Sequence, residues 1–176
     1  LWWWWGFGEM VMTVCKRLYR HLGMTRWRQR RAFPPATLAA IEAAIASGES
    51  RHGGQVRFAV EDALSPGAIL GGCTAQSRAI EVFSLLRVWD TEHNNGVLVY
   101  VLLADRAVEI VADRGINARV GAAGWTGICE QMEAAFGRRD FRGGALDGIA
   151  AVTGVIATHF PAGGGPNELP DRPVLL

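Results

Sequence analysis

Two apolar runs separated by a short break constrain the fold of this chain more than any other feature. Residues 97–103 and 107–112 are rich in β-branched side chains, and only residues 104–106 stand between them. Runs of this composition with so short a break are typical of two antiparallel strands joined in a hairpin. The sequence therefore predicts a hairpin near the middle of the chain.

The register of this hairpin decides which loops become neighbours. The break contains no Asn-Gly or Asp-Gly pair, so the turn residues do not fix the register by themselves. Closing the break with the tightest turn places Val97 opposite Arg114. The loop at residues 90–95 then meets the loop predicted at residues 113–121.

The rest of the chain alternates between helical and strand patterns. A strand, a helix and a second strand in this order form a crossover that is right-handed and has parallel strands. The hairpin adds an antiparallel strand, so we predict an α/β fold: a three-layer α/β/α domain around a short mixed sheet, with one parallel crossover and an antiparallel hairpin. Helices are expected at residues 35–48, 75–86, 124–137 and 141–160, a strand at 55–60, and a glycine-rich loop at 61–74.

Length and composition indicate one folded domain with two flanking segments. The chain has 176 residues, 49% hydrophobic and 20% charged, which is ordinary for a globular protein and excludes a disordered one. Its three scattered cysteines predict neither a disulfide framework nor a zinc site, and no apolar run reaches the roughly 18 residues of a spanning helix. We expect no signal peptide and a cytoplasmic location. The predicted parts are residues 1–33, a basic arm; residues 34–160, the domain; and residues 161–176, an extended tail.

The arm concentrates positive charge beside aromatic residues. Its seven basic residues and one Glu give it a net charge of +6. Within it a short amphipathic basic helix is expected, and such a segment can contact an anionic membrane surface, whereas nucleic acid is the less favoured partner. The alternatives are a solvated or disordered leader and, for residues 1–23, an artefact of the start site. The basic residues proposed for membrane contact are Lys16, Arg17, Arg20, Arg26, Arg28, Arg30 and Arg31.

Three stretches of the domain resemble the TPM domain family. They are Trp89 followed by Asn-Gly-Val-Leu-Val-Tyr-Val at 95–101, Val-Glu-Ile-Val-Ala-Asp-Arg-Gly-Ile at 108–116, and Phe-Arg-Gly-Gly at 141–144. The resemblance covers about residues 33–160. It implies a small α/β/α domain, and it brings phosphatase activity, divalent cation binding and a role in maintaining membrane complexes as expectations.

The two loops brought together by the hairpin carry oxygen-rich side chains. Carboxylate and amide oxygens are the ligands that Ca²⁺ and Mg²⁺ prefer, so a site for either cation is predicted here. Solvated turns with local hydrogen bonds are the alternative, and Arg114 can pair with the same acids. The carboxyl ends of the parallel strands, with Glu61, Asp62 and Asp105, form a competing site. The predicted cation ligands are Asp90, Glu92, Asn94, Asn95 and Asp113.

Three hypotheses of function follow. The first is a noncatalytic, cation-modulated binding or assembly module that acts on an unidentified protein partner. The second is a metal-dependent phosphatase that uses Asp90, Glu92 and Asp113, although the sequence contains no recognised nucleophile motif and His93 is its nearest potential base. The third is contact with a membrane or nucleic acid through the basic arm.

Overall fold

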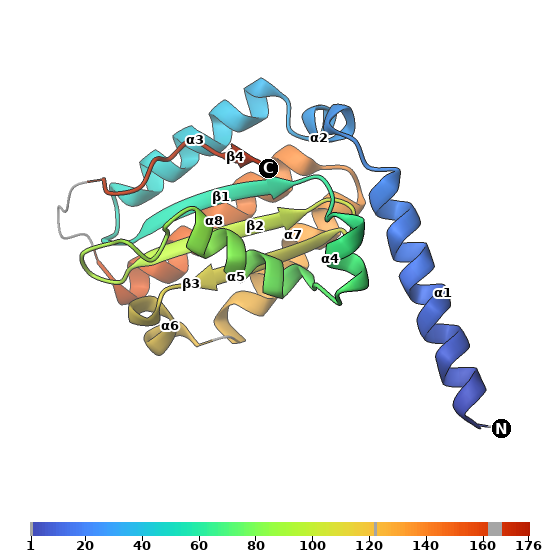
Figure 1. Cartoon of the computed structure of the whole chain (residues 1–176). Helices are drawn as coiled ribbons and strands as arrows, with labels where there is room; N and C mark the ends of the chain where they lie inside the picture. Colours follow the sequence, from blue (N-terminus) through green and yellow to red (C-terminus); the bar gives the residue numbers. More distant parts are fainter. Residues whose placement is uncertain (1, 122, 162–166) are drawn as a thin grey trace.

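The computed structural model describes residues 2–121, 123–161 and 167–176, with side chains from residue 12 onwards (Figure 1). Eight helices and four strands are assigned in these ranges. The helices are α1 (Trp2–Leu22), α2 (Arg26–Ala32), α3 (Pro35–Glu49), α4 (Pro66–Leu70), α5 (Ala75–Leu85), α6 (Arg114–Val120), α7 (Ala123–Gly137) and α8 (Phe141–His159). The strands are β1 (Gln55–Glu61), β2 (Gly96–Leu102), β3 (Ala107–Ala112) and β4 (Val174–Leu175).

The strands form one mixed sheet in the order β3-β2-β1-β4. Strand β1 is parallel to β2 and to β4, while β2 and β3 form the predicted antiparallel hairpin. Helix α5 provides the crossover between β1 and β2, and its N-terminus is closed by a capping box between Thr74 and Ser77. The predicted mixed sheet with its crossover and hairpin is confirmed.

The predicted hairpin register is wrong by two residues. Val97 lies opposite Ala112, not Arg114. The turn spans residues 103–106, four instead of the two that the tightest closure requires, and Arg106 takes a left-handed conformation with φ of 56°. Because side chains alternate along a strand with period two, this shift leaves every side chain on its predicted face of the sheet.

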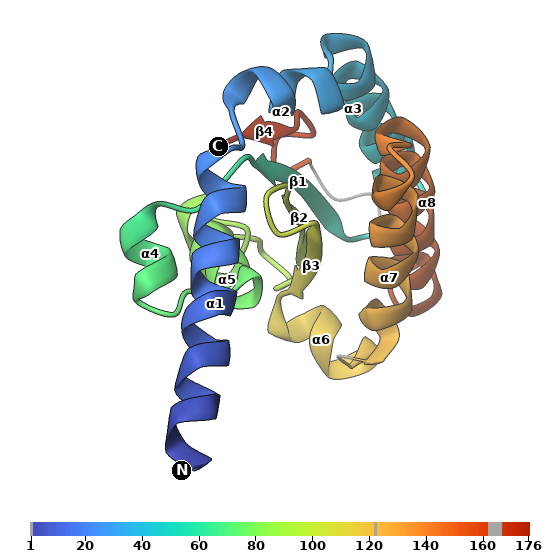
Figure 2. The same cartoon turned by 90° about the vertical axis from the view of Figure 1, so that its right-hand side faces the viewer.

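Helices cover both faces of the sheet, as the three-layer prediction requires (Figure 2). Helices α3, α7 and α8 pack on the face that carries Phe58, Val99 and Val101. Helix α5 packs on the opposite face, against Leu98 and Tyr100, and α1 and α4 lie on the same side. Each strand residue of β1 and β2 is buried, which is typical of a sheet enclosed between two helical layers.

Two predicted loops contain short helices. Residues 66–70 of the glycine-rich loop form α4, whose cap Ser65 accepts a hydrogen bond from Ala68 N–H. The segment after β3 forms α6, whose cap Asp113 accepts one from Arg114 N–H. Helices of five and seven residues are too short to show a helical period in the sequence. The prediction of loops is therefore corrected to short helices at residues 66–70 and 114–120.

The two flanking segments dock onto the domain. At the C-terminal end, β4 pairs with Ala59 and Val60, so part of the predicted extended tail adds an edge strand, while residues 162–166 lie outside the described residues. At the N-terminal end, the Gln29 side chain donates to the carbonyls of Val60 and Leu176. The far end of α1 extends away from the domain in Figure 1. No described helix is long and apolar enough to cross a membrane.

Candidate functional site

Hydrogen bonds join the two loops that the sequence predicts to meet. Gly115 N–H donates to Asn94 O at 3.1 Å, and Asp113 N–H donates to Gly96 O at 2.8 Å. The Arg114 Nε–H group donates to Asn94 Oδ1 at 3.3 Å. The loop before β2 and the start of α6 are therefore neighbours at the amino end of the parallel strands.

The five predicted cation ligands do not share one environment. Asp90 and Glu92 are exposed, and Asn94 receives the hydrogen bond from Arg114. Asp113 caps α6 through Oδ1, while its Oδ2 atom is buried without a hydrogen-bond partner. Asn95 is only 3% exposed, and its Nδ2 group donates to Gly53 O. The Asn95 Oδ1 atom is also buried without a partner.

A polar cleft of about 820 Å³ lies in this region, and only some of the five predicted ligands line it. Glu92 and Asn95 line the cleft, whereas Asp90, Asn94 and Asp113 do not. Among the described residues, no group of three or more His, Cys, Asp and Glu side chains is arranged to hold a metal ion. The carboxyl and amide side chains that line the cleft come from the end of α3, the start of β1, the loop before β2 and the tail.

Glu49 and Asp171 bring two carboxyl groups together in this cleft. Glu49 Oε1 accepts a hydrogen bond from Val56 N–H at 2.7 Å, while Oε2 is buried without a donor. Burial raises the pKa of Glu49 to about 7; the Val56 N–H bond opposes this rise and the adjacent Asp171 carboxyl adds to it. Two carboxylates side by side need a shared proton or a cation, and Arg57 nearby offsets only part of their repulsion.

His52 supplies a hydrogen-bond donor to the same region. Its Nδ1 atom accepts from Gly54 N–H at 3.2 Å, which assigns the ring proton to Nε2. Burial lowers the pKa of His52, so the ring is neutral at pH 7. The Nε2 atom is buried and has no partner. The cleft thus combines a neutral donor, an amide acceptor and a carboxyl pair.

Glu49, His52 and Asp171 were not predicted as site residues. The sequence places them at the end of a helix, before a strand and in the tail, and nothing in their spacing joins them. Six buried side-chain atoms in the described part of the chain have no hydrogen-bond partner, and three of them, Glu49 Oε2, His52 Nε2 and Asn95 Oδ1, belong to residues that line this cleft. These three atoms identify the site in the structure.

The competing site at the carboxyl end of the strands is occupied by ion pairs. Asp105 accepts hydrogen bonds from Arg17, Arg20 and His21 of α1. Glu61 accepts three from Arg78 and one from Tyr100 Oη–H at 2.5 Å. Burial and the Glu61 contact raise the pKa of Tyr100, so this hydroxyl remains protonated. The acids at this end hold α1 and α5 in place.

Only two of the seven basic residues of the arm take part in the ion pairs with Asp105. Arg17 and Arg20 are engaged by Asp105, and the other five side chains of the predicted membrane-contact set are exposed. Those five are Lys16, Arg26, Arg28, Arg30 and Arg31.

A mixed sheet of this order between two helical layers, with a polar cleft at the amino ends of its parallel strands, defines a small α/β domain. The chain belongs to the TPM domain family, whose model matches residues 28–155. This match includes most of α2 and most of α8, and so begins slightly before the predicted start at residue 34.

Two solved structures have the same fold. The BA42 protein from the psychrophilic bacterium Bizionia argentinensis, solved by NMR, is 28% identical, with a TM-score of 0.70 over 80% of this chain and 93% of that chain. The N-terminal domain of a protein from P. gingivalis, also solved by NMR, is 16% identical, with a TM-score of 0.58 over 72% of this chain and 77% of that one. No curated protein sequence matches the chain.

Proposed function

We propose that this TPM domain is a noncatalytic binding module whose polar cleft takes up a divalent cation, Ca²⁺ or Mg²⁺. The observation that carries the proposal is the Glu49 and Asp171 carboxyl pair in a cleft that is also lined by Asn95, whose Oδ1 atom has no partner. Mg²⁺ is often held by one or two carboxylates with waters completing its shell, and Ca²⁺ also accepts amide oxygens. Two of the ligands predicted from the sequence, Glu92 and Asn95, line the same cleft.

The side chains of the cleft favour binding over hydrolysis. Among the described lining residues the only hydroxyl belongs to Ser50, and it donates to the backbone oxygen of Ser47 at 2.8 Å. His52 is neutral with its proton on the nitrogen that has no partner, so it is a donor and not a general base in this state. Covalent catalysis by a side-chain hydroxyl requires that hydroxyl to contact a base, and Ser50 contacts a backbone carbonyl instead.

A cation titration followed by backbone NMR tests the proposal. Ca²⁺ or Mg²⁺ is expected to shift the amides of Glu49, Asn95 and Asp171, with a dissociation constant on the order of 10⁻⁴–10⁻³ M. Glu49→Gln removes one ligand charge and is expected to weaken binding about tenfold. Glu42→Gln is the matched control, because Glu42 is an exposed residue of the same helix that does not line the cleft. Shifts confined to residues 90 and 113–119 would place the cation at Asp113 and contradict the cleft site.

The pKa of Glu49 makes cation affinity depend on pH. Protons and cations compete for this carboxyl, so affinity is expected to rise between about pH 6 and pH 8 as Glu49 ionises around its pKa of about 7. In the cation-free protein the raised pKa of Glu49 makes the folded state less stable as the pH rises. The contribution of Glu49 to stability is complete below its unfolded pKa of 4.5 and is lost as the pH rises through about 7.

Glu49→Gln separates these two effects. The variant is expected to lose the pH dependence of cation affinity. At pH 8 without cation it is expected to be more stable than the original protein, because the buried charge of Glu49 and its repulsion with Asp171 are gone. Calorimetric titrations at pH 6, 7 and 8 and urea unfolding with EDTA measure the two quantities. An unchanged slope of affinity against pH in the variant would show that another group titrates.

A further inference from the structure

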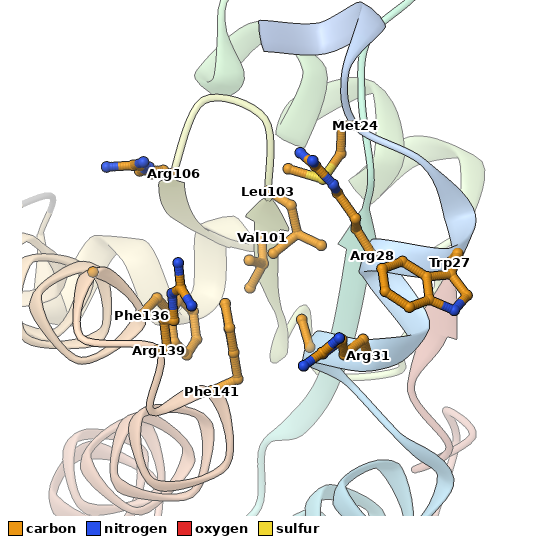
Figure 3. Close-up of a pocket in the computed structure, with 12 residues that line it drawn as sticks. Met24, Trp27, Arg28, Arg31, Val101, Leu103, Arg106, Phe136, Arg139 and Phe141 are labelled. Atoms are coloured by element: carbon orange, nitrogen blue, oxygen red, sulfur yellow. The ribbon is translucent and has the colours of Figure 1, made fainter.

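A second pocket lies at the opposite end of the sheet, where the α2 helix faces two turns (Figure 3). Its volume is about 640 Å³. Helix α2 forms one wall, and the β2–β3 turn and the α7–α8 turn form the other. None of the ligands proposed for the polar cleft lines it.

The rim of this pocket carries four arginines and no acidic residue. Arg28 and Arg31 come from α2, while Arg106 and Arg139 come from the two turns (Figure 3). No salt bridge joins any of the four to a described carboxylate, in contrast to Arg17 of α1. The pocket therefore has an excess of positive charge that the described part of the protein does not neutralise.

The floor of the pocket is apolar. Val101 and Leu103 contribute from the end of β2, and Phe136 stacks on Phe141 with ring centroids 5.5 Å apart. On the α2 wall, Trp27 is 66% exposed, and the Arg31 guanidinium lies over its ring at 5.4 Å from the centroid. An apolar floor below a charged rim suits a ligand with one apolar end and one anionic end.

Both arginines on the turns have an unusual backbone conformation, which they share with Arg87 and Asn94 outside the pocket. Arg106 and Arg139 have φ angles of 56° and 65°, in the left-handed region where Gly or Asn is the usual residue. Such a conformation is unfavourable for a residue that carries a Cβ atom. Two of the arginines that line the pocket therefore stand at turn positions that would ordinarily favour glycine.

We propose that this pocket binds an amphiphile with a phosphate head, with the phosphate held by Arg31 and Arg139 and the apolar chain lying over Phe136 and Phe141. Figure 3 shows Arg31 extending from α2 towards the side of the pocket where Arg139 stands. Guanidinium groups bind phosphate through paired, charge-assisted hydrogen bonds, and several of them match a doubly charged phosphate monoester better than a carboxylate. The source of this chemistry is either a free alkyl phosphate or the head group of a phospholipid.

Binding of dodecyl phosphate below its micelle concentration, measured by Trp fluorescence with EDTA present, tests the proposal. Inorganic phosphate alone is expected to bind at least about tenfold more weakly because it makes no contact with the apolar floor. Arg31→Gln and Arg139→Gln are each expected to weaken dodecyl phosphate binding about tenfold. Arg30→Gln and Arg138→Gln are matched controls, since both residues are exposed sequence neighbours that do not line the pocket.

Vesicles containing phosphatidic acid distinguish the two sources. Association that falls in Arg31→Gln and Arg139→Gln but not in their controls would identify a lipid head group as an occupant, and its absence with dodecyl phosphate binding retained would identify a free amphiphile. The urea unfolding midpoints of all four variants are expected to match that of the original protein, as is usual for exposed side chains. Equal losses in test and control variants, or inorganic phosphate binding as tightly as dodecyl phosphate, would overturn the proposal.

Discussion

Replacement of Gly96 by alanine is expected to lower the free energy of unfolding by about 3 kcal/mol or more. Gly96 begins β2, and a Cβ atom there would lie 1.9 Å from the carbonyl oxygen of Val88. A backbone carbonyl cannot rotate away as the end of a flexible side chain can. Relief of the clash requires movement of the loop at residues 88–95 or displacement of β2 from the sheet.

Urea unfolding at pH 7 measures this loss, and Gly127→Ala provides the control. Gly127 lies inside α7, and a Cβ atom added there would meet nothing within 4 Å. Alanine there is expected to raise stability by up to about 1 kcal/mol, because glycine is the weaker helix former. A loss below about 0.5 kcal/mol for Gly96→Ala would mean that the loop before β2 tolerates a shift, and that its packing does not fix the cleft.

The sequence predicts the strands of the sheet better than their register. Alternation and β-branched composition located β1, β2 and β3, because those patterns are set by burial on the two faces of the sheet. The register failed because it depends on the conformation of one turn residue, Arg106, and arginine gives no signal for a left-handed backbone. The two-residue strand β4 depends entirely on contacts with β1, far away along the sequence.

The candidate sites were less predictable because, like β4, they depend on contacts between residues far apart in the sequence. Glu92 and Asn95 were predicted as ligands because they lie close together in one polar loop. Their neighbours Glu49 and Asp171 are separated by 122 positions in the sequence, and only the packing of the tail beside α3 and β1 joins them. The arginine pocket likewise unites α2 with two distant turns, and residue spacing carries no information about such a contact.

Replacement of Asp105 by asparagine is expected to lower stability by about 2 kcal/mol at pH 7 and to loosen α1. The carboxylate accepts hydrogen bonds from Arg17 at 2.7 Å, Arg20 at 3.1 Å and His21 at 3.0 Å. The His21 side chain is only 1% exposed, so it loses its charged partner without gaining water. Hydrogen exchange of amides 12–22 is expected to accelerate more than exchange in β1 or β2, since α1 can detach while the sheet remains folded.

The pH dependence of this loss follows from the pKa of Asp105. Burial alone raises that pKa, but the hydrogen bonds from Arg17 and His21 outweigh burial and hold it below 3.8. A lowered carboxyl pKa stabilises the fold above the unfolded value, and this stabilisation disappears as the pH falls through the folded value. The difference between the original protein and Asp105→Asn should therefore stay constant from pH 7 to about pH 4 and shrink only below 3.8.

Glu81→Gln is the control for the Asp105 result. Glu81 forms a salt bridge with Arg78 at 2.9 Å, but its side chain is 59% exposed, and such pairs contribute no more than about 0.5 kcal/mol. Urea unfolding of both variants between pH 7 and pH 3 compares an enclosed ion-pair cluster with an exposed one. Equal, small losses would mean that the apolar contacts of Val14 and Leu18, and not the ion pairs of Asp105, dock α1.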